Sequence, residues 1–176
     1  MTWWVPDGMV VPMDAPESGE ARAVGALEAA GIHYVLTRHD RVSSLAEAAA
    51  ARGLEPSGVI KTIVVRRGDD DFLFVLVPGD RTISWPKLRT LLDVSRLSMP
   101  DAAVALEVTG YERGTITPFG STHPWPVVAD ERVVGRPVSI GAGAHGVAAT
   151  VGGDDLVAAL HATVADVTEP EARIDD

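Results

Sequence analysis

Apolar residues along the chain follow two different spacings, which predict where helices and strands form. A helical spacing covers 20–30, with Gly31 as a stop, and a capping-box pattern at Ser44 opens an alanine-rich helix that ends near Gly53. Further helices are expected at 86–92, 101–108 and 154–161. β-Branched runs predict a hairpin of 59–67 and 72–77 around a turn at 68–71, and shorter strands at 33–37, 127–129, 138–140, 147–151 and 164–167.

This order of elements mixes a hairpin with scattered helices, which favours a mixed α+β fold over a strictly alternating α/β one. The expected architecture is a mainly antiparallel mixed sheet with peripheral helices. A chain of 176 residues fits one domain, assigned here to 19–176. Residues 1–18 contain three prolines among hydrophobic residues and predict an irregular arm, in which Trp3 and Trp4 are expected to be buried.

Composition narrows the classes of function. The chain has no cysteine, which excludes disulfides, thiolate metal ligands and a cysteine nucleophile. No apolar run approaches the roughly 20 residues that span a bilayer, and the first residues lack the features of a leader, so we expect a cytoplasmic protein without a membrane partner. The net charge of −10 argues against tight binding of a polyanion, although a local cationic pocket suffices to hold one end of an RNA.

Common catalytic motifs are absent. The sequence has no GxSxG, HExxH or Walker lysine motif, and its five histidines lack ligand spacing, so neither a metal nor another cofactor is expected. Three aspartates at 69–71 are interpreted as solvated turn residues. The run 141–146 matches GxGxxG, but the β-like segment after it does not suit a dinucleotide-binding helix, so we interpret the match as chance.

Two features are unusual for a structural role alone. Lys61 interrupts an otherwise apolar strand, where it either occupies an edge or snorkels to solvent, or else meets an anionic ligand or developing negative charge in a cleft. The run 109–120 is long and glycine-rich yet carries apolar residues. Such a segment either serves as a connection or presents backbone N–H and C=O groups to a ligand.

Together these features resemble the YbaK-like family of aminoacyl-tRNA deacylases, which also occurs as the editing insertion of bacterial prolyl-tRNA synthetases. The resemblance covers roughly 31–167, and no single motif carries it. Its elements, in the family's order, are His39, Ser43-Ser44, 59–62, 77–80, 109–111, the GxxxP run 114–118, Phe119-Gly120, 143–146 and Asp155-Leu156.

The resemblance implies a catalytic lysine at Lys61 and a pocket around the aminoacyl ester shaped by Gly114, with no protein nucleophile. It implies the aminoacyl-tRNA acceptor end as partner, allows a synthetase as a second one, and suggests small noncognate amino acids on tRNA(Pro). Thr62 stands where some relatives carry asparagine, which leaves the choice of amino acid open. Further substrate contacts are expected at His39, Thr62, Thr109, Gly110, Tyr111, Thr117, Pro118, Phe119, Gly143 and His145.

Two other functions fit the same residues. The first is a non-catalytic module that docks a synthetase or carries a tRNA end, which the acidic composition mildly favours. The second is a hydrolase of another small ester or amide that retains the fold without the RNA partner. Hydrolysis of mischarged tRNA, and its dependence on the tRNA body, distinguish the three.

Overall fold

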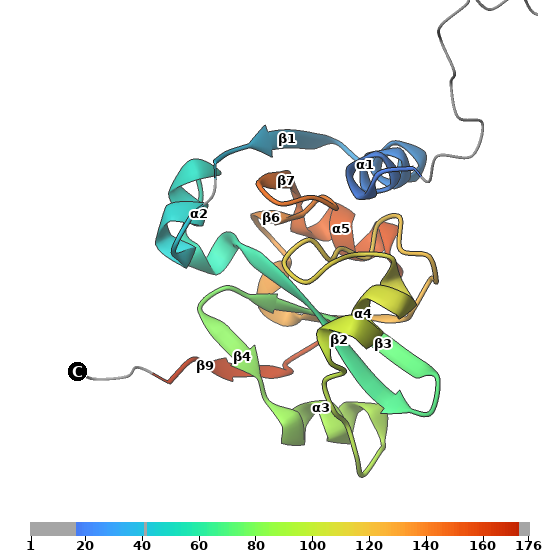
Figure 1. The fold of residues 1–176 in the computed structure, drawn as a ribbon. Coiled ribbons are helices and arrows are strands. Elements are labelled where there is room, and N and C mark those ends of the chain that lie inside the picture. The colour runs from blue at the N-terminus through green and yellow to red at the C-terminus, as the bar shows by residue number, and fades with distance from the viewer. Residues whose placement is uncertain (1–16, 41, 173–176) are drawn as a thin grey trace, which may run out of the picture.

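The computed structural model describes residues 17–40 and 42–172 (Figure 1). The predicted arm 1–18 lies outside this part except for its last two residues, so the expectation for Trp3 and Trp4 also lies outside it. Ser18 caps the first helix, α1 (Gly19–Ala30), because its hydroxyl accepts a hydrogen bond from Ala21 N. Gly31, in the left-handed conformation, ends this helix as predicted.

The predicted hairpin forms one half of a four-stranded sheet. Strands β2 (Ile60–Gly68) and β3 (Asp71–Pro78) pair antiparallel, and β5 (Val127–Asp130) and β8 (Thr163–Ala165) follow in parallel, in the order β2-β3-β5-β8. Strand β2 is therefore an edge strand. Strand β3 is buried along almost its whole length, since both faces of the sheet are covered.

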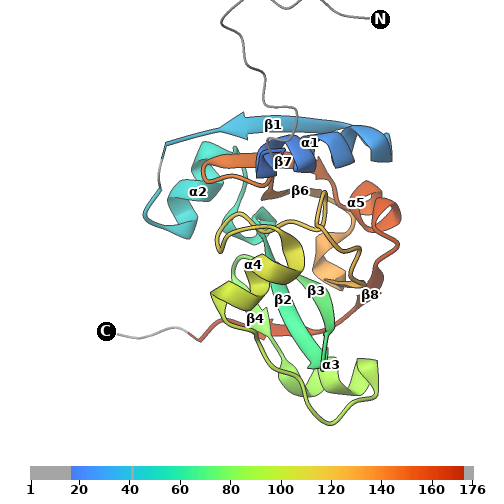
Figure 2. The same cartoon turned by 45° about the vertical axis from the view of Figure 1, so that its right-hand side comes forward.

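A second, three-stranded sheet lies at one end of the molecule, and α3 (Trp85–Leu92) lies at the other (Figures 1 and 2). Strands β1 (Tyr34–Arg38), β7 (Val147–Gly152) and β6 (Pro137–Gly141) pair antiparallel in that order. Helix α2 (Leu45–Ala51) and the short 3-10 helix η1 (Pro56–Gly58) connect this sheet to β2. The expected mixed α+β class is confirmed, with antiparallel pairs predominating among the described strands.

The chain after β7 differs from its predicted form. Helix α5 (Gly153–Ala159) ends two residues before the predicted boundary, and the strand predicted at 164–167 corresponds to β8, which already ends at Ala165. A separate strand, β9 (Thr168–Pro170), follows outside the predicted range. Strand β9 pairs with β4 (Arg81–Ile83), a strand that the hydrophobic pattern did not predict. The chain breaks between β8 and β9 because the buried carboxylate of Asp130 accepts hydrogen bonds from Val167 N and the Thr168 hydroxyl, which turns the chain away from β5.

Two hydrophobic clusters lie on opposite faces of the four-stranded sheet. Ile60 and Val64 of β2 belong to the larger one, and Val65, one position out of phase, belongs to the smaller one. This alternation follows from the two-residue period of a strand. It places Thr62 on the face of the larger cluster and Lys61 on the face that carries β4 and α3.

Candidate functional site

A cavity of about 670 Å³ lies along the edge strand β2, which is a volume typical of small-molecule sites. One wall is β2 itself, and the opposite wall comes from helix α4 (Ala102–Thr109), the residues before it, and the loop after it. The residues that line it are Arg52, Val59, Ile60, Lys61, Thr62, Ile63, Val64, Met99, Pro100, Asp101, Ala102, Ala105, Arg113, Gly114 and Ile116. Both predicted catalytic positions, Lys61 and Gly114, are among them.

Lys61 is half-buried in this wall. Its Nζ donates a hydrogen bond to the carbonyl oxygen of Arg81, 2.6 Å away, at the start of β4. Lys61 does lie on an edge strand, as one of the alternatives expected. Its ammonium, however, is hydrogen-bonded to the protein and does not extend freely into solvent. This bond directs the ammonium toward β4, on the sheet face opposite Thr62, and it uses one of the three N–H donors that an ammonium carries.

Two further polar groups in the wall lack partners among the described residues. The Thr62 hydroxyl oxygen and the Arg52 Nε are both buried without a hydrogen bond. Arg52 makes one long side-chain bond, from Nη1 to the Ser139 hydroxyl at 3.3 Å, and burial lowers the pKa of its guanidinium. Unsatisfied buried polar groups and desolvated charges cost stability, so their presence around a cavity is typical of a binding site.

Arg52 was not predicted from the sequence. It follows the last residue of α2 and lies nine positions before Lys61. The sequence pattern there predicts only the end of a surface helix. Only the turn through η1 brings the helix end beside β2. The one signal in the sequence was an arginine close to the cavity lysine, which is too common a pattern to identify a site.

Hydrogen bonds hold the loop after α4, and Gly114 of this loop lines the cavity. Arg22 of α1 donates to the carbonyl oxygen of Gly110 at 2.6 Å, and the Tyr111 hydroxyl donates to the Phe119 carbonyl oxygen, also at 2.6 Å. Gly114 has a φ of +89°, which favours glycine, and a Cβ there would lie 3.2 Å from Cε1 of His145. Gly114 therefore stands where the cavity, this loop and the His145 loop meet.

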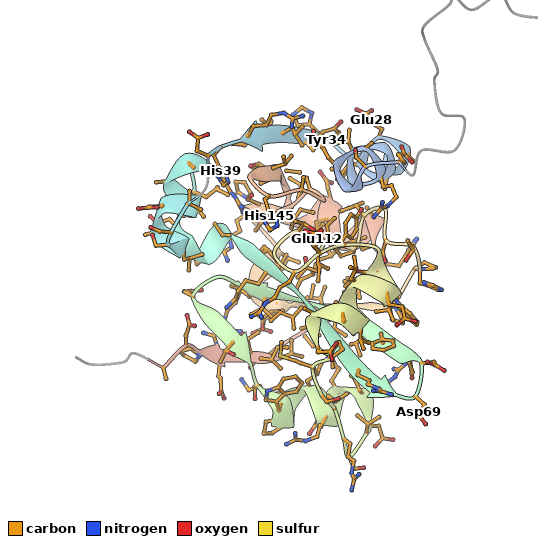
Figure 3. All side chains as sticks on the ribbon, viewed as in Figure 1. Glu28, Tyr34, His39, Asp69, Glu112 and His145 are labelled. Atoms are coloured by element: carbon orange, nitrogen blue, oxygen red, sulfur yellow. The ribbon has the colours of Figure 1, made fainter. Side chains whose placement is uncertain are left out.

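The predicted contacts at 143–146 and His39 gather beside a second, smaller hollow of about 240 Å³. Gly143 and His145 line it together with Gly110 and Tyr111. His39 N donates to the Gly146 carbonyl oxygen at 2.9 Å, so His39, the residue directly after strand β1, supports this loop. Figure 3 shows His39, His145 and Glu112 in the same part of the molecule, far from Asp69 at the hairpin tip. The GxGxxG match forms the β6–β7 turn, as expected of a chance match.

Four of the predicted substrate contacts are inside the protein. Thr109, Tyr111, Thr117 and Phe119 are each at most 4 % exposed. Tyr111 borders the smaller hollow, Phe119 packs in the larger core cluster, and Thr109 caps the end of its helix through Tyr111 N. Pro118 is half-buried beside them and does not line the cavity. We interpret these residues as supports of the loop that carries Gly114.

The cavity is locally cationic in an acidic protein. Arg52, Lys61 and Arg113 line it against one carboxylate, that of Asp101, whereas the whole chain has a net charge of −10. Such a site can bind an anionic group and stabilise negative charge that develops on a carbonyl oxygen. Within 17–40 and 42–172, no three histidine or carboxylate groups come close enough to hold a metal ion, and no helix is long and apolar enough to cross a membrane.

Fold and site together define an α+β domain with a cationic ligand cavity on a sheet edge and no nucleophile of the usual hydrolase motifs. The chain matches the aminoacyl-tRNA editing domain over 39–159, and it belongs to that family.

Known relatives and structures agree with this assignment. The chain is 32% identical over 89 residues to a proline–tRNA ligase from Bacillus licheniformis and 33% identical over 90 residues to one from Trichlorobacter lovleyi. These matches cover 51% of this chain but only 15% and 16% of the ligases, so the similarity concerns one part of a much larger enzyme.

Among solved structures, a protein described as a candidate trans-editing enzyme for prolyl-tRNA synthetase superposes with a TM-score of 0.78 at 26% identity. The superposition covers 88% of this chain and 99% of that one. The protein APE2540 gives a TM-score of 0.77 at 27% identity, over 84% and 99% of the two chains. The similarity therefore extends over nearly the whole described fold.

Proposed function

We propose that this protein is a hydrolase that removes a small noncognate amino acid from mischarged tRNA, with tRNA(Pro) as the substrate. The observation that carries the proposal is the shared cavity of Lys61 and Gly114, the two positions expected to act on the ester. Membership of the editing-domain family and the likeness to a candidate trans-editing enzyme support it. A charged tRNA as substrate also implies a cytoplasmic protein, with a synthetase as a second partner.

The chemistry requires little from the protein, because an aminoacyl ester is already activated. Water adds to the ester carbonyl carbon and gives up a proton, negative charge develops on the carbonyl oxygen, and the bond to the ribose oxygen breaks as that oxygen takes up the proton. The protein must place the ester and water and stabilise the oxyanion. We assign the stabilising charge to Lys61, whose ammonium is fixed by the Arg81 carbonyl oxygen and retains two free N–H donors.

The other unpartnered groups of the wall are assigned to binding. Arg52 has the charge to hold the phosphate of the terminal nucleotide, and its one side-chain hydrogen bond among the described residues is the long bond from Nη1 to Ser139. We assign the Thr62 hydroxyl, which is buried in the wall without a hydrogen bond, to a contact with the aminoacyl group. Gly114 lets the loop pass close to the His145 ring, because a Cβ there would lie 3.2 Å from His145 Cε1. Selection among small amino acids then depends on shape, since one methylene changes binding by about 1–3 kcal/mol.

A deacylation screen tests this proposal. One tRNA(Pro) preparation is charged in turn with alanine, serine, cysteine and proline, and loss of each ester is followed at equal enzyme concentration. We expect at least one small noncognate ester to be hydrolysed and the prolyl ester to be spared. Binding of the charged tRNA without hydrolysis would instead support a non-catalytic module. Equal hydrolysis of a free aminoacyl ester, unaffected by the tRNA body, would support a hydrolase of another small ester.

A further inference from the structure

A second cationic hollow, of about 360 Å³, lies at the far end of β2, around the tip of the β2–β3 hairpin and the end of α3. Four arginines line it, Arg66, Arg67, Arg89 and Arg96, together with Gly68, Asp69, Ser95, Leu97 and Ser98. Figures 1 and 3 place this hairpin tip, with Asp69, at the opposite end of the molecule from the β1–β7–β6 sheet. None of the proposed catalytic steps uses these residues.

The four arginines differ in how they are paired. Arg66 contacts Asp69 at 3.3 Å and Arg67 contacts Asp71 at 2.9 Å, and both pairs are partly exposed. Within 17–40 and 42–172, Arg89 and Arg96 form neither an ion pair nor a side-chain hydrogen bond, although Asp93 lies near them in sequence. The guanidinium groups of Arg89 and Arg96 are thus available to bind an anion in this hollow. Phosphate suits them, because a planar guanidinium can donate two parallel hydrogen bonds to it.

The two cationic hollows are connected. Strand β2 carries Lys61 at one end and Arg67 at the other, and a strand of this length places them about 20 Å apart. The segment 95–102 runs beside β2 and lines both hollows, with 95–98 at the arginines and 99–102 at the cavity. Ser98 fixes it by pairing with the Arg66 backbone, through N–H···O bonds of 2.7 and 3.1 Å. Met99, 60% exposed, offers an apolar surface between the hollows.

Charge is concentrated along this edge. Three basic residues in the cavity and four in the hollow make seven of the chain's 15, whereas only Asp101 and Asp69 of its 25 acidic residues line the same surfaces. The net charge of −10 means that the rest of the surface repels RNA. A polyanion is therefore directed to the basic edge along β2. The spacing suits a short single-stranded segment whose last nucleotide lies in the cavity.

We propose that the hollow of Arg66, Arg67, Arg89 and Arg96 binds backbone phosphates of the RNA 3′ end as it runs along β2 into the Lys61 cavity. This proposal rests on the proposed function for the identity of the RNA, but it concerns binding and requires no hydrolysis. Because only Arg89 and Arg96 are free of carboxylate partners, the hollow neutralises few phosphates. The salt dependence of binding is therefore modest.

The test measures binding of an uncharged RNA, so that its outcome is independent of catalysis. The probe is a fluorescein-labelled acceptor stem–loop with a single-stranded 3′ tail, and anisotropy gives Kd over a series of salt concentrations. The variants are Arg89→Gln with Arg96→Gln, and Lys87→Gln as a control that removes a positive charge from the same helix outside the hollow. Melting temperatures of all three proteins show that the fold is retained.

We expect the double variant to weaken binding about tenfold and to lower the slope of log K against log salt by about 1.4–1.8, for two phosphates lost. Lys87→Gln should leave both values unchanged. Equal behaviour of the two variants would overturn the proposal, and so would an unaltered slope in the double variant. If the wild type binds the RNA as expected but hydrolyses no charged tRNA, the proposed function fails while the RNA path stands.

Discussion

The Lys61 cavity and the His145 hollow share the loop 110–116, yet they differ in charge and in unused polar groups. Gly114 and Ile116 face the cavity, whereas Gly110, Tyr111 and Thr115 face the smaller hollow. The cavity has three basic side chains and two buried polar atoms without partners in its wall. In the smaller hollow, Tyr111 is already bonded through its hydroxyl. From this contrast we expect the cavity side of the loop to contact the substrate and the other side to position the loop.

The largest effect is expected for Lys61→Ala. Loss of one preorganised electrostatic contact typically lowers the rate by about 10²–10³, and we expect this fall in kcat/KM for the charged tRNA. The free energy of unfolding should fall by only about 1 kcal/mol, because the variant loses the hydrogen bond to the Arg81 carbonyl oxygen but no core contact. Lys87→Ala is the matched control, because Lys87 is the only other lysine and also donates to a backbone carbonyl. A stable Lys61→Ala protein with normal turnover would remove this residue from the mechanism.

Arg52→Leu should weaken substrate binding by about tenfold, since a charge-assisted hydrogen bond contributes about 1.5–3 kcal/mol. The change appears in KM more than in kcat if the group holds phosphate in the ground state. Stability should stay constant or rise, because the substitution removes a desolvated charge without a carboxylate partner.

Arg136→Leu provides the contrast for Arg52. Arg136 is half-buried but fully engaged, with bonds to the Ser57 hydroxyl, the Ser57 carbonyl and the Arg132 carbonyl. We expect this variant to lose stability by more than about 1 kcal/mol while its folded fraction retains activity. Comparable losses of activity in both variants, measured as kcat/KM beside chemical denaturation, would show that Arg52 is structural.

Gly114→Ala tests the shared rim of the two hollows. An alanine at a φ of +89° is strained by about 1–2 kcal/mol, and its methyl group would approach the His145 ring. Gly135→Ala is matched in backbone, with a φ of +79°, but has open space around the added Cβ. Both variants should lose similar stability, and only Gly114→Ala should also lose activity, by several fold. Equal activity of the two variants would separate Gly114 from the site.

Tyr111→Phe should have the smallest effect, and on stability rather than chemistry. It removes the hydrogen bond to the Phe119 carbonyl oxygen, at a cost of about 1 kcal/mol, while kcat/KM changes by about twofold or less. Burial raises the pKa of the Tyr111 hydroxyl above its ordinary value of 10.0. The unfolded chain therefore loses this proton first, and the stability that the folded state derives from it is lost as pH rises above about 10.

The phenylalanine variant should show less of this alkaline loss. Denaturation of both proteins at pH 8 and above pH 10 measures the difference. A strong fall in kcat/KM for Tyr111→Phe, with unchanged stability, would mean that the smaller hollow takes part in the reaction and that the two sides of the loop are not distinct.

Much of this fold could be predicted from local pattern. Gly31 and Gly110 end their helices because a left-handed residue closes a helix, and the β-branched runs form the β2–β3 hairpin at the expected positions. Lys61 was identified because a lysine within an apolar strand is unusual whatever the partner strands are. Strands β4 and β9 were missed because each has only three residues and pairs with the other, which lies far away in the chain.

The sequence by itself determined the elements, their caps and the position of a cation within a hydrophobic strand, since each depends on residues close together in the chain. Only the tertiary structure decided that β2 is an edge strand, that Arg52 and Gly114 share its cavity, and that Thr109 and Phe119 are buried. The physical reason is that a strand's two-residue period fixes which side chains share a face but not what covers that face. The elements that cover each face come from distant segments of the chain. They pack there because the apolar side chains on both faces of the sheet must be buried.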